Sequence, residues 1–343
     1  MKRYNLALLG FGNVGQAFAR LLLSKTAELR QRYGIEWRLT GVNARRYGWL
    51  AKPEGLDVQA LLASATEPKI QISAARLENP HAALRDWLRA AEPDVLFEAT
   101  SLNPLTGQPA IGHIRAGLEF GAHVVTANKG PVVFAYEELR DLAVARSRRF
   151  MFESTVMDGA PIFSLFREAL PAANLLRFRG VLNSTTNFII TEMEVGRSFE
   201  EAVKRAQAIG IAETDPSADI DGWDAAVKVA ALATVLMGIP LKPAEIQREG
   251  IRHLTGEMVR VARLEGEPYK LVCRAERDGE RVRASIRPEQ VPLSDPLSAV
   301  SGTSSLVHFE TDVLTGLTIT EHNPSPETTA YGLLADFVNA VKA

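Results

Sequence analysis

Five carboxylates and one lysine lie within the 17 residues from 212 to 228, and such a group can bind and protonate a polar ligand. Pro216 and Gly222 predict an ordered loop for the first part of this segment. Asp224 and Lys228 stand four residues apart on the helix expected next, so they share one face. Carboxylates beside a lysine suit a ligand that carries an ammonium together with a hydroxyl or carbonyl group. The alternative is an exposed ion pair beside a solvated acidic loop.

A glycine-rich turn follows the first apolar run of the chain, which ends at Leu9. Its six residues are Gly10, Phe11, Gly12, Asn13, Val14 and Gly15. An amphipathic segment comes next, and in this setting the Gly-x-Gly-x-x-Gly spacing predicts a dinucleotide site. The first glycine permits the tight turn, the second lets the backbone approach a pyrophosphate, and the third lets the helix pack closely on the strand. A glycine-rich turn without a ligand is the alternative.

The end of the second predicted strand indicates which dinucleotide binds. Sites that prefer NAD usually carry Asp or Glu here, to hold the ribose 2′-hydroxyl. This chain has Asn43 followed by Ala44, Arg45 and Arg46. Two guanidinium groups and no carboxylate favour the 2′-phosphate of NADP(H) over NAD(H). For either arginine alone, an exposed loop without a ligand is the alternative.

A second lysine, Lys129, follows the strand expected near residues 123–127. Ligands of open α/β sheets bind at the carboxyl ends of the strands, where Lys129 is expected to lie with Thr100 and Ser101. These three residues are therefore predicted to stand near the nicotinamide. A simple loop charge is the alternative interpretation of Lys129.

The order of predicted helices and strands that position these side chains changes along the chain. Apolar runs near 4–9, 37–42, 95–100, 123–127 and 150–153 alternate with helical patterns and predict a Rossmann-type, doubly wound parallel sheet. From about 158 the pattern is α+β, with helices predicted near 162–170, 199–208, 223–237 and 328–341 and strands near 175–183, 270–285 and 306–319. We expect a nucleotide-binding domain over 1–150, an α+β domain over 151–320, and a C-terminal helix over 321–343 that returns to the first domain.

Composition excludes several classes of protein. The chain has 343 residues, 46% hydrophobic, with net charge −2, which is ordinary for a globular protein. No apolar stretch approaches the ~18 residues of a membrane span, and the near-neutral charge favours neither nucleic acid nor a membrane surface. Cys273 is the only cysteine, which excludes an intramolecular disulfide and suits a reducing compartment. We therefore expect a cytoplasmic protein that binds a small molecule.

Over nearly its whole length, the chain resembles the homoserine dehydrogenases. The resemblance is carried by segments 10–15, 124–131, 183–189 and 212–228. It implies reversible NAD(P)-linked reduction of L-aspartate 4-semialdehyde to L-homoserine, on the route to threonine and methionine. It also implies the short form of the family, without a C-terminal regulatory domain.

Matching motif positions imply roles for individual residues. Lys228 and Lys129 correspond to the lysines that transfer a proton and orient the substrate. The residues implied to bind or shape the substrate site are Glu213, Asp224, Asp219 and Thr186, and those implied at the nicotinamide are Thr100 and Ser101. The implied backbone ligands of a monovalent cation, with sodium suited to such oxygen donors, are Glu153, Val156, Asp158 and Ala160. A homodimer through the second domain's sheet is also implied, with residues 175–181 as a candidate strand.

Two departures from the family pattern keep other functions open. Ser184 stands where the family usually has glycine, and residues 322–329 replace a glycine-rich turn. The alternatives are a catalytically silent NADP-binding relative and a related amino-acid oxidoreductase with a changed substrate. An aspartate-semialdehyde dehydrogenase is disfavoured, because its chemistry requires a nucleophilic cysteine and Cys273 has no histidine or glycine-rich context.

Overall fold

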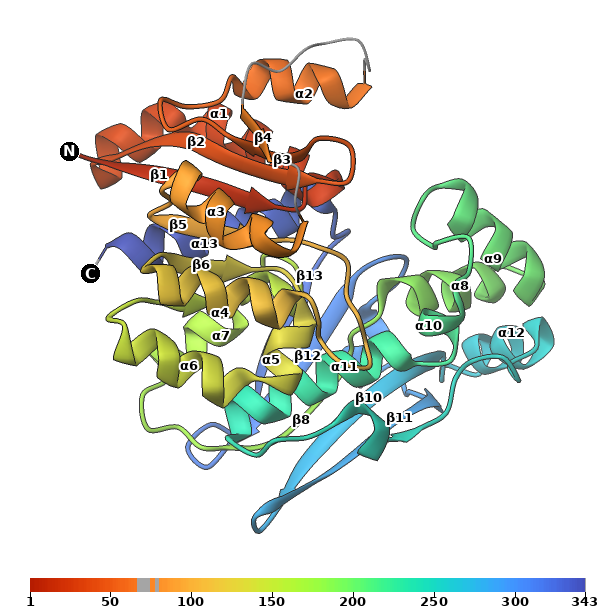
Figure 1. The fold of residues 1–343 in the computed structure, drawn as a ribbon. Coiled ribbons are helices and arrows are strands. Elements are labelled where there is room, and N and C mark those ends of the chain that lie inside the picture. The colour runs from red at the N-terminus through yellow and green to blue at the C-terminus, as the bar shows by residue number, and fades with distance from the viewer. Residues whose placement is uncertain (67–74, 78–79, 343) are drawn as a thin grey trace. The chain divides into compact units, whose positions relative to one another are not determined.

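The computed structural model describes residues 1–66, 75–77 and 80–342 (Figure 1). The chain forms two compact units, Met1–Gly159 with Ser325–Ala343, and Ala160–Pro324. These limits differ by a few residues from the domain boundaries expected from the sequence. Among the described helices, none combines the length and apolar character needed to cross a membrane.

The first unit is built on a seven-stranded sheet in the order β4-β3-β2-β1-β5-β6-β7. Its parallel strands are β1 (Lys2–Leu9), β2 (Ile35–Ala44), β5 (Val95–Glu98), β6 (His123–Thr126) and β7 (Phe150–Met151). The predicted doubly wound parallel sheet is thus confirmed. Two short antiparallel edge strands were not predicted, β3 (Gly48–Ala51) and β4 (Ala75–Leu77). β3 pairs with β2, and β4 pairs with β3. Strands of three or four residues are too short to show a clear periodic pattern in the sequence.

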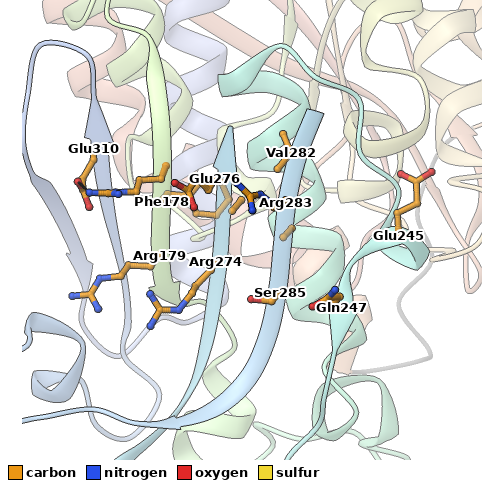
Figure 2. Close-up of a pocket in the computed structure, with 13 residues that line it drawn as sticks. Phe178, Arg179, Glu245, Gln247, Arg274, Glu276, Val282, Arg283, Ser285 and Glu310 are labelled. Atoms are coloured by element: carbon orange, nitrogen blue, oxygen red, sulfur yellow. Dashed lines mark hydrogen bonds and ion pairs between the residues drawn. The ribbon is translucent and has the colours of Figure 1, made fainter. Parts of the chain in front are cut away.

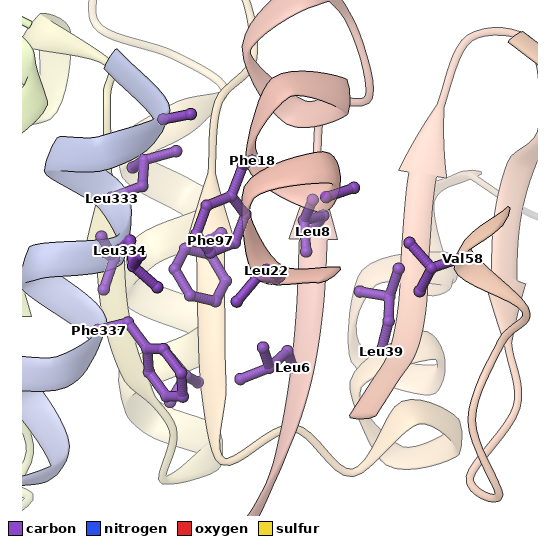
Figure 3. Close-up of a cluster of buried hydrophobic side chains, with 14 of the residues drawn as sticks. Leu6, Leu8, Phe18, Leu22, Leu39, Val58, Phe97, Leu333, Leu334 and Phe337 are labelled. Atoms are coloured by element: carbon purple, nitrogen blue, oxygen red, sulfur yellow. The ribbon is translucent and has the colours of Figure 1, made fainter. Parts of the chain in front are cut away.

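Helices flank this sheet, and one of them comes from the far end of the chain. They are α1 (Asn13–Tyr33), α2 (Val58–Thr66), α3 (Pro80–Ala91), α4 (Ala110–Phe120), α5 (Lys129–Phe134), α6 (Tyr136–Ala145) and α13 (Pro326–Val341). In Figure 3 Phe18 of α1 and Phe337 of α13 converge on Phe97 of β5, with ring centroids 4.4 and 6.0 Å from that of Phe97. α13 therefore completes the core of the nucleotide-binding unit.

The second unit contains a six-stranded sheet in the order β13-β12-β8-β10-β11-β9. Its strands are β8 (Leu175–Val181), β9 (Gln247–Arg248), β10 (Tyr269–Asp278), β11 (Arg281–Gln290), β12 (Ser305–Thr311) and β13 (Leu317–Glu321). All pairings are antiparallel except that of β9 with β11. The run predicted near 270–285 is a hairpin that turns at Gly279, where φ is 63°.

Helices pack on one face of the second sheet, and they include elements missed from the sequence. They are α7 (Ile162–Ser164), α8 (Ser184–Glu194), α9 (Phe199–Ala208), α10 (Ser217–Ile220), α11 (Trp223–Leu232) and α12 (Gly256–Leu264). α8 was not predicted as a helix. The predicted loop over 212–222 contains α10, because Pro216 is compatible with the first turn of a helix that needs to last only one turn.

The opposite face of this sheet, here called the outer sheet face, carries charged side chains (Figure 2). The register places Arg274 of β10 opposite Arg179 of β8, and Glu276 opposite Arg177. Arg177 pairs with Glu310 of β12, with 2.6 Å between Nη2 and Oε2. This face is therefore polar, as expected for an antiparallel sheet with one face on the core.

Candidate active site

The glycine-rich turn has the backbone geometry that a pyrophosphate site requires. Gly10 adopts φ +99°, and a Cβ there would clash with the carbonyl of Ala99. A Cβ on Gly15 would clash with the carbonyl of Gly10, whereas one on Gly12 would meet no described atom within 4 Å. Gly10 and Gly15 therefore allow close packing, and Gly12 leaves open space at the start of α1, where helix N–H groups attract anions.

A cavity of about 520 Å³ runs along this turn. Eight residues predicted for the cofactor line it: Gly10, Phe11, Gly12, Asn43, Arg45, Arg46, Thr100 and Ser101. Four others do not line it: Asn13, Val14 and Gly15, which belong to the first turn of α1, and Lys129. Lining residues that the sequence analysis missed are Gln16, Ala44, Tyr47, Ala65, Ala99 and Pro109. The glycine spacing alone could not identify them, because most of them come from other parts of the chain.

One end of the cavity carries the two arginines. Arg45 and Arg46 are exposed, and Arg46 Nη1 donates to the carbonyl of Ala65 at 2.7 Å. The Tyr47 ring stands edge-on to Phe11, with 6.1 Å between the centroids. None of the described residues that line this cavity is acidic. The side chains at this end are therefore basic, aromatic or uncharged.

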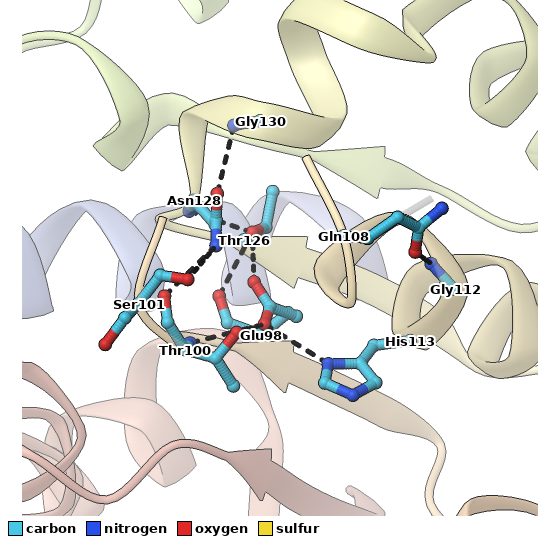
Figure 4. A network of polar contacts seen from close by, with 9 residues as sticks. All are labelled: Glu98, Thr100, Ser101, Gln108, Gly112, His113, Thr126, Asn128 and Gly130. Atoms are coloured by element: carbon cyan, nitrogen blue, oxygen red, sulfur yellow. Dashed lines mark hydrogen bonds and ion pairs between the residues drawn. The ribbon is translucent and has the colours of Figure 1, made fainter. Parts of the chain in front are cut away.

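Thr100 and Ser101 form the other end, at the carboxyl end of β5 (Figure 4). The Asn128 side chain donates through Nδ2 to the carbonyl of Thr100 at 3.1 Å, and its Oδ1 accepts from the Gly130 N–H at 3.0 Å. Asn128 thereby caps α5, whose first residue is Lys129. Lys129 thus starts its helix at the carboxyl end of β6, next in the sheet to β5, as the sequence predicted.

In the second unit, Lys228 lies in a half-buried polar cluster. Its Nζ is 3.5 Å from Oδ2 of Asp224, one turn earlier on α11, and donates to the carbonyl of Leu182 at 2.7 Å. The two side chains are only 14% and 20% exposed, so the alternative of an exposed ion pair is wrong. Leu182 directly follows β8, so strand and helix together aim the ammonium group.

Asn183 links this pair to the loop that precedes α11. Its Nδ2 donates to Oδ1 of Asp219 at 2.7 Å and to Oδ2 of Asp224 at 3.0 Å. Its Oδ1 accepts from the Thr186 N–H at 2.8 Å and so caps α8. Asn183 opens segment 183–189, but no role was predicted for it, although asparagine before a helix is a recognised capping signal.

The other predicted substrate residues are placed differently. Desolvation by burial and the nearby Asp224 charge raise the pKa of Asp219 above its ordinary value, while the bond from Asn183 opposes this shift. Thr186 is fully buried, with its hydroxyl bonded to Asn183, so it supports Asn183 and offers no surface to a substrate. Glu213 is exposed, and its carbonyl accepts from Gln207 at 3.2 Å. The structure thus brings together Lys228, Asp224 and Asp219, but not the Glu213 carboxylate.

Comparisons with known proteins agree on the family. Two models match the chain, one described as homoserine dehydrogenase over residues 161–338 and one as the homoserine dehydrogenase NAD-binding domain over residues 10–153. The chain belongs to the homoserine dehydrogenase family. An NAD(+)-dependent homoserine dehydrogenase from Pseudomonas canavaninivorans is 33% identical, over 99% of this chain and 96% of the relative.

Solved structures of similar proteins extend the family likeness to the fold. A crystal structure of a putative homoserine dehydrogenase from Archaeoglobus fulgidus has a TM-score of 0.85 at 30% identity, covering 99% of both chains. A hyperthermophilic archaeal homoserine dehydrogenase in complex with NADPH has a TM-score of 0.83 at 27% identity, covering 99% of this chain and 98% of that one. One relative is thus named for NAD and another structure holds NADPH. Both cofactors occur in the family, so membership of the family does not decide whether this chain binds NAD(H) or NADP(H).

Three of the residues predicted to hold a cation, Glu153, Val156 and Asp158, follow β7 in the first unit, and the fourth, Ala160, is the first residue of the second unit. The Glu153 N–H donates to Oδ2 of Asp336 at 2.7 Å, and the Thr329 hydroxyl bonds the Asp158 carboxylate. The carbonyl of Ala160 accepts from the Ile162 N–H at 2.9 Å, and Val156 is buried. In the described part of the chain, no group of three His, Cys, Asp or Glu side chains suits a metal ion. A cation here would rely on main-chain oxygens.

Proposed function

We propose that the protein is an NADP(H)-dependent homoserine dehydrogenase. It reduces L-aspartate 4-semialdehyde reversibly to L-homoserine, in threonine and methionine biosynthesis in the cytoplasm. The observation that carries the proposal is the Lys228 ammonium group held beside Asp224 and the Leu182 carbonyl, in a chain with the family's dinucleotide fingerprint.

The side chains divide the chemistry between them. Asp224 and Asp219 attract the substrate ammonium group, and Lys129 orients the substrate. Lys228 polarises the aldehyde and gives a proton to the oxygen as the alkoxide forms. The nicotinamide, when bound, supplies the hydride.

The test is the absorbance at 340 nm of purified protein with L-aspartate 4-semialdehyde and NADPH. We expect substrate-dependent loss of NADPH, and a fall of roughly 10²–10⁴-fold in kcat for Lys228→Ala, the usual contribution of a positioned proton donor. Lys204→Ala, at a lysine on α9, is the matched control. Wild-type protein that binds NADPH without reducing the aldehyde would instead be a silent or re-purposed relative.

The preference for NADP(H) rests on Arg45 and Arg46 and on the lack of an acidic side chain among the described residues that line the cavity. Replacing both arginines by alanine should raise KM for NADPH by about tenfold, the loss of one charge-assisted contact, and leave KM for NADH nearly unchanged. Replacing both Arg30 and Arg32 by alanine, at exposed positions on α1, removes the same two charges and is the matched control. Equal effects on both cofactors would overturn the preference.

We further propose that the protein is a homodimer that associates through the outer sheet face. Arginines and glutamates both occur there, so the face can pair with a second copy of itself. Light scattering after size exclusion should give twice the chain mass, and Arg274→Glu should shift it toward the monomer. Arg260→Glu, at an exposed arginine on α12, should not. A wild-type monomer would contradict the proposal.

For the cation we propose sodium, held by the carbonyl oxygens of Glu153, Val156, Asp158 and Ala160. Hard oxygen donors suit this ion. Exchange of sodium chloride for choline chloride at constant ionic strength should lower the melting temperature. Identical melting curves would remove the cation from the proposal.

A further inference from the structure

Glu98 is a fully buried carboxylate directly behind the wall of the cofactor cavity. It is the last residue of β5, between β1 and β6 (Figure 4). Its Oε1 accepts from the Thr100 N–H at 3.2 Å and from the Thr100 hydroxyl. The Thr126 hydroxyl lies 3.0 Å from the main-chain carbonyl oxygen of Glu98 and 3.2 Å from Oε2. Both contacts with Thr100 use the carboxyl group as an acceptor.

Burial of a carboxylate is unfavourable unless a basic side chain or hydrogen-bond donors lie beside it. Nδ1 of His113, on α4, lies 3.4 Å from Oε1, and this side chain is 14% exposed. In the part of the chain that the structure describes, His113 is the only basic side chain that pairs with Glu98. Only one imidazole and a few hydroxyl or amide donors face the carboxylate. Its negative potential is therefore only partly screened and acts on groups in the neighbouring cavity.

The same carboxylate fixes a segment that touches the cofactor cavity. Thr100 is held by Glu98 through its N–H and hydroxyl, and by Asn128 through its carbonyl. Ser101 is held through its carbonyl, which Asn128 Nδ2 approaches to 3.4 Å. Thr100 and Ser101 line the cavity at the end away from Arg45 and Arg46. With the pyrophosphate at the glycine turn and the adenosine at the arginines, this end receives the nicotinamide.

We propose that Glu98 is a positioning residue for the nicotinamide that also favours the oxidised, positively charged ring over the neutral reduced one. It acts through Thr100, whose backbone separates the carboxylate from the cavity. This proposal rests on the proposed function in one respect, since it needs a nicotinamide nucleotide in the cavity. It does not need turnover of a particular aldehyde.

The test measures the dissociation constants of NADP⁺ and NADPH separately, by calorimetric titration of Glu98→Gln and wild-type protein. This substitution keeps the shape of the side chain and removes its charge, so binding of NADP⁺ should weaken by about tenfold while binding of NADPH changes little. Glu119→Gln, at an exposed glutamate on α4, is the matched control and should leave both constants unchanged. A merely structural role would weaken both nucleotides equally, and that result would overturn the proposal.

A second variant keeps the test decisive if Glu98→Gln does not fold. Glu98→Asp keeps the charge but withdraws the carboxylate from Thr100. Both nucleotides should then bind more weakly, with the ratio of their constants as in wild type. Unchanged constants would show that Glu98 does not position the segment. Wild-type protein that binds neither nucleotide would overturn the cofactor assignment, whereas binding without aldehyde reduction would leave the Glu98 test valid and overturn only the proposed reaction.

Discussion

At the scale of single residues, Asn183 shows how one side chain serves both fold and site. Its oxygen caps α8, and its amide nitrogen bonds Asp219 and Asp224, which lie 36 and 41 residues further along the chain. The amide hydrogens offset the repulsion between the two carboxylates. Asn183 therefore holds two carboxyl groups together beside Lys228.

Two substitutions of Asn183 separate these functions. Serine retains a capping oxygen but, like alanine, lacks the amide donor, so Asn183→Ser should be about 1 kcal/mol more stable than Asn183→Ala in urea unfolding. Both variants should show the same rise in KM for the aldehyde. Wild-type KM in the serine variant would mean that the amide does not organise the carboxylates.

Cys273 is the residue whose reactivity the structure limits most clearly. It is fully buried on β10, and burial raises its pKa to about 12. The thiolate is the reactive form, so native protein at pH 8 should not react with a disulfide reagent, and urea-unfolded protein should release one equivalent. Rapid labelling of the native chain would contradict this burial.

At the scale of elements, the glycines in the turn from β1 into α1 differ in function: Gly15 serves packing and Gly12 serves ligand binding. Gly15 permits packing against the Gly10 carbonyl, and Gly12 faces open space. Gly15→Ala should therefore lower the free energy of unfolding by about 1–3 kcal/mol, as overpacking does. Gly12→Ala should leave stability unchanged and weaken NADPH binding by about tenfold, or 1.4 kcal/mol. Thermal melts and fluorescence titration check the pair, and a destabilised Gly12→Ala would reverse the assignment.

At the scale of the whole molecule, His123 makes stability depend on pH. Burial, with the Arg148 charge second, lowers its pKa from 6.5 to about 4. Its Nδ1 also accepts from the Arg149 N–H at 3.1 Å, which requires a neutral ring. Between pH 6.5 and 4, His123 is protonated in the unfolded chain but stays neutral in the folded chain. The stability that the neutral, buried ring contributes is therefore lost as pH falls toward 4.

Replacing the ring tests this linkage. The melting temperature of His123→Gln should fall less steeply than that of wild type between pH 6.5 and 4. His253→Gln, at a half-exposed histidine in the second unit, should follow the wild-type slope. Parallel curves for all three proteins would exclude His123 as the source.

Much of this organisation was readable from the sequence, because its signals are local. Alternating apolar runs predicted the parallel strands, three glycines predicted the turn, and four-residue spacing placed Asp224 and Lys228 on one face. Each signal depends on backbone geometry or helical periodicity within a few residues. Such constraints act wherever the segment lies in the fold.

The tertiary structure decided what depends on distant partners. Pairing with β2 and β4 makes β3 a strand, which no local pattern indicated. Only the fold joins Asn183 to Asp219, and places Glu98 behind Thr100 with His113 beside it. These contacts depend on which surfaces meet, and that is a property of the whole chain, absent from any one segment's pattern.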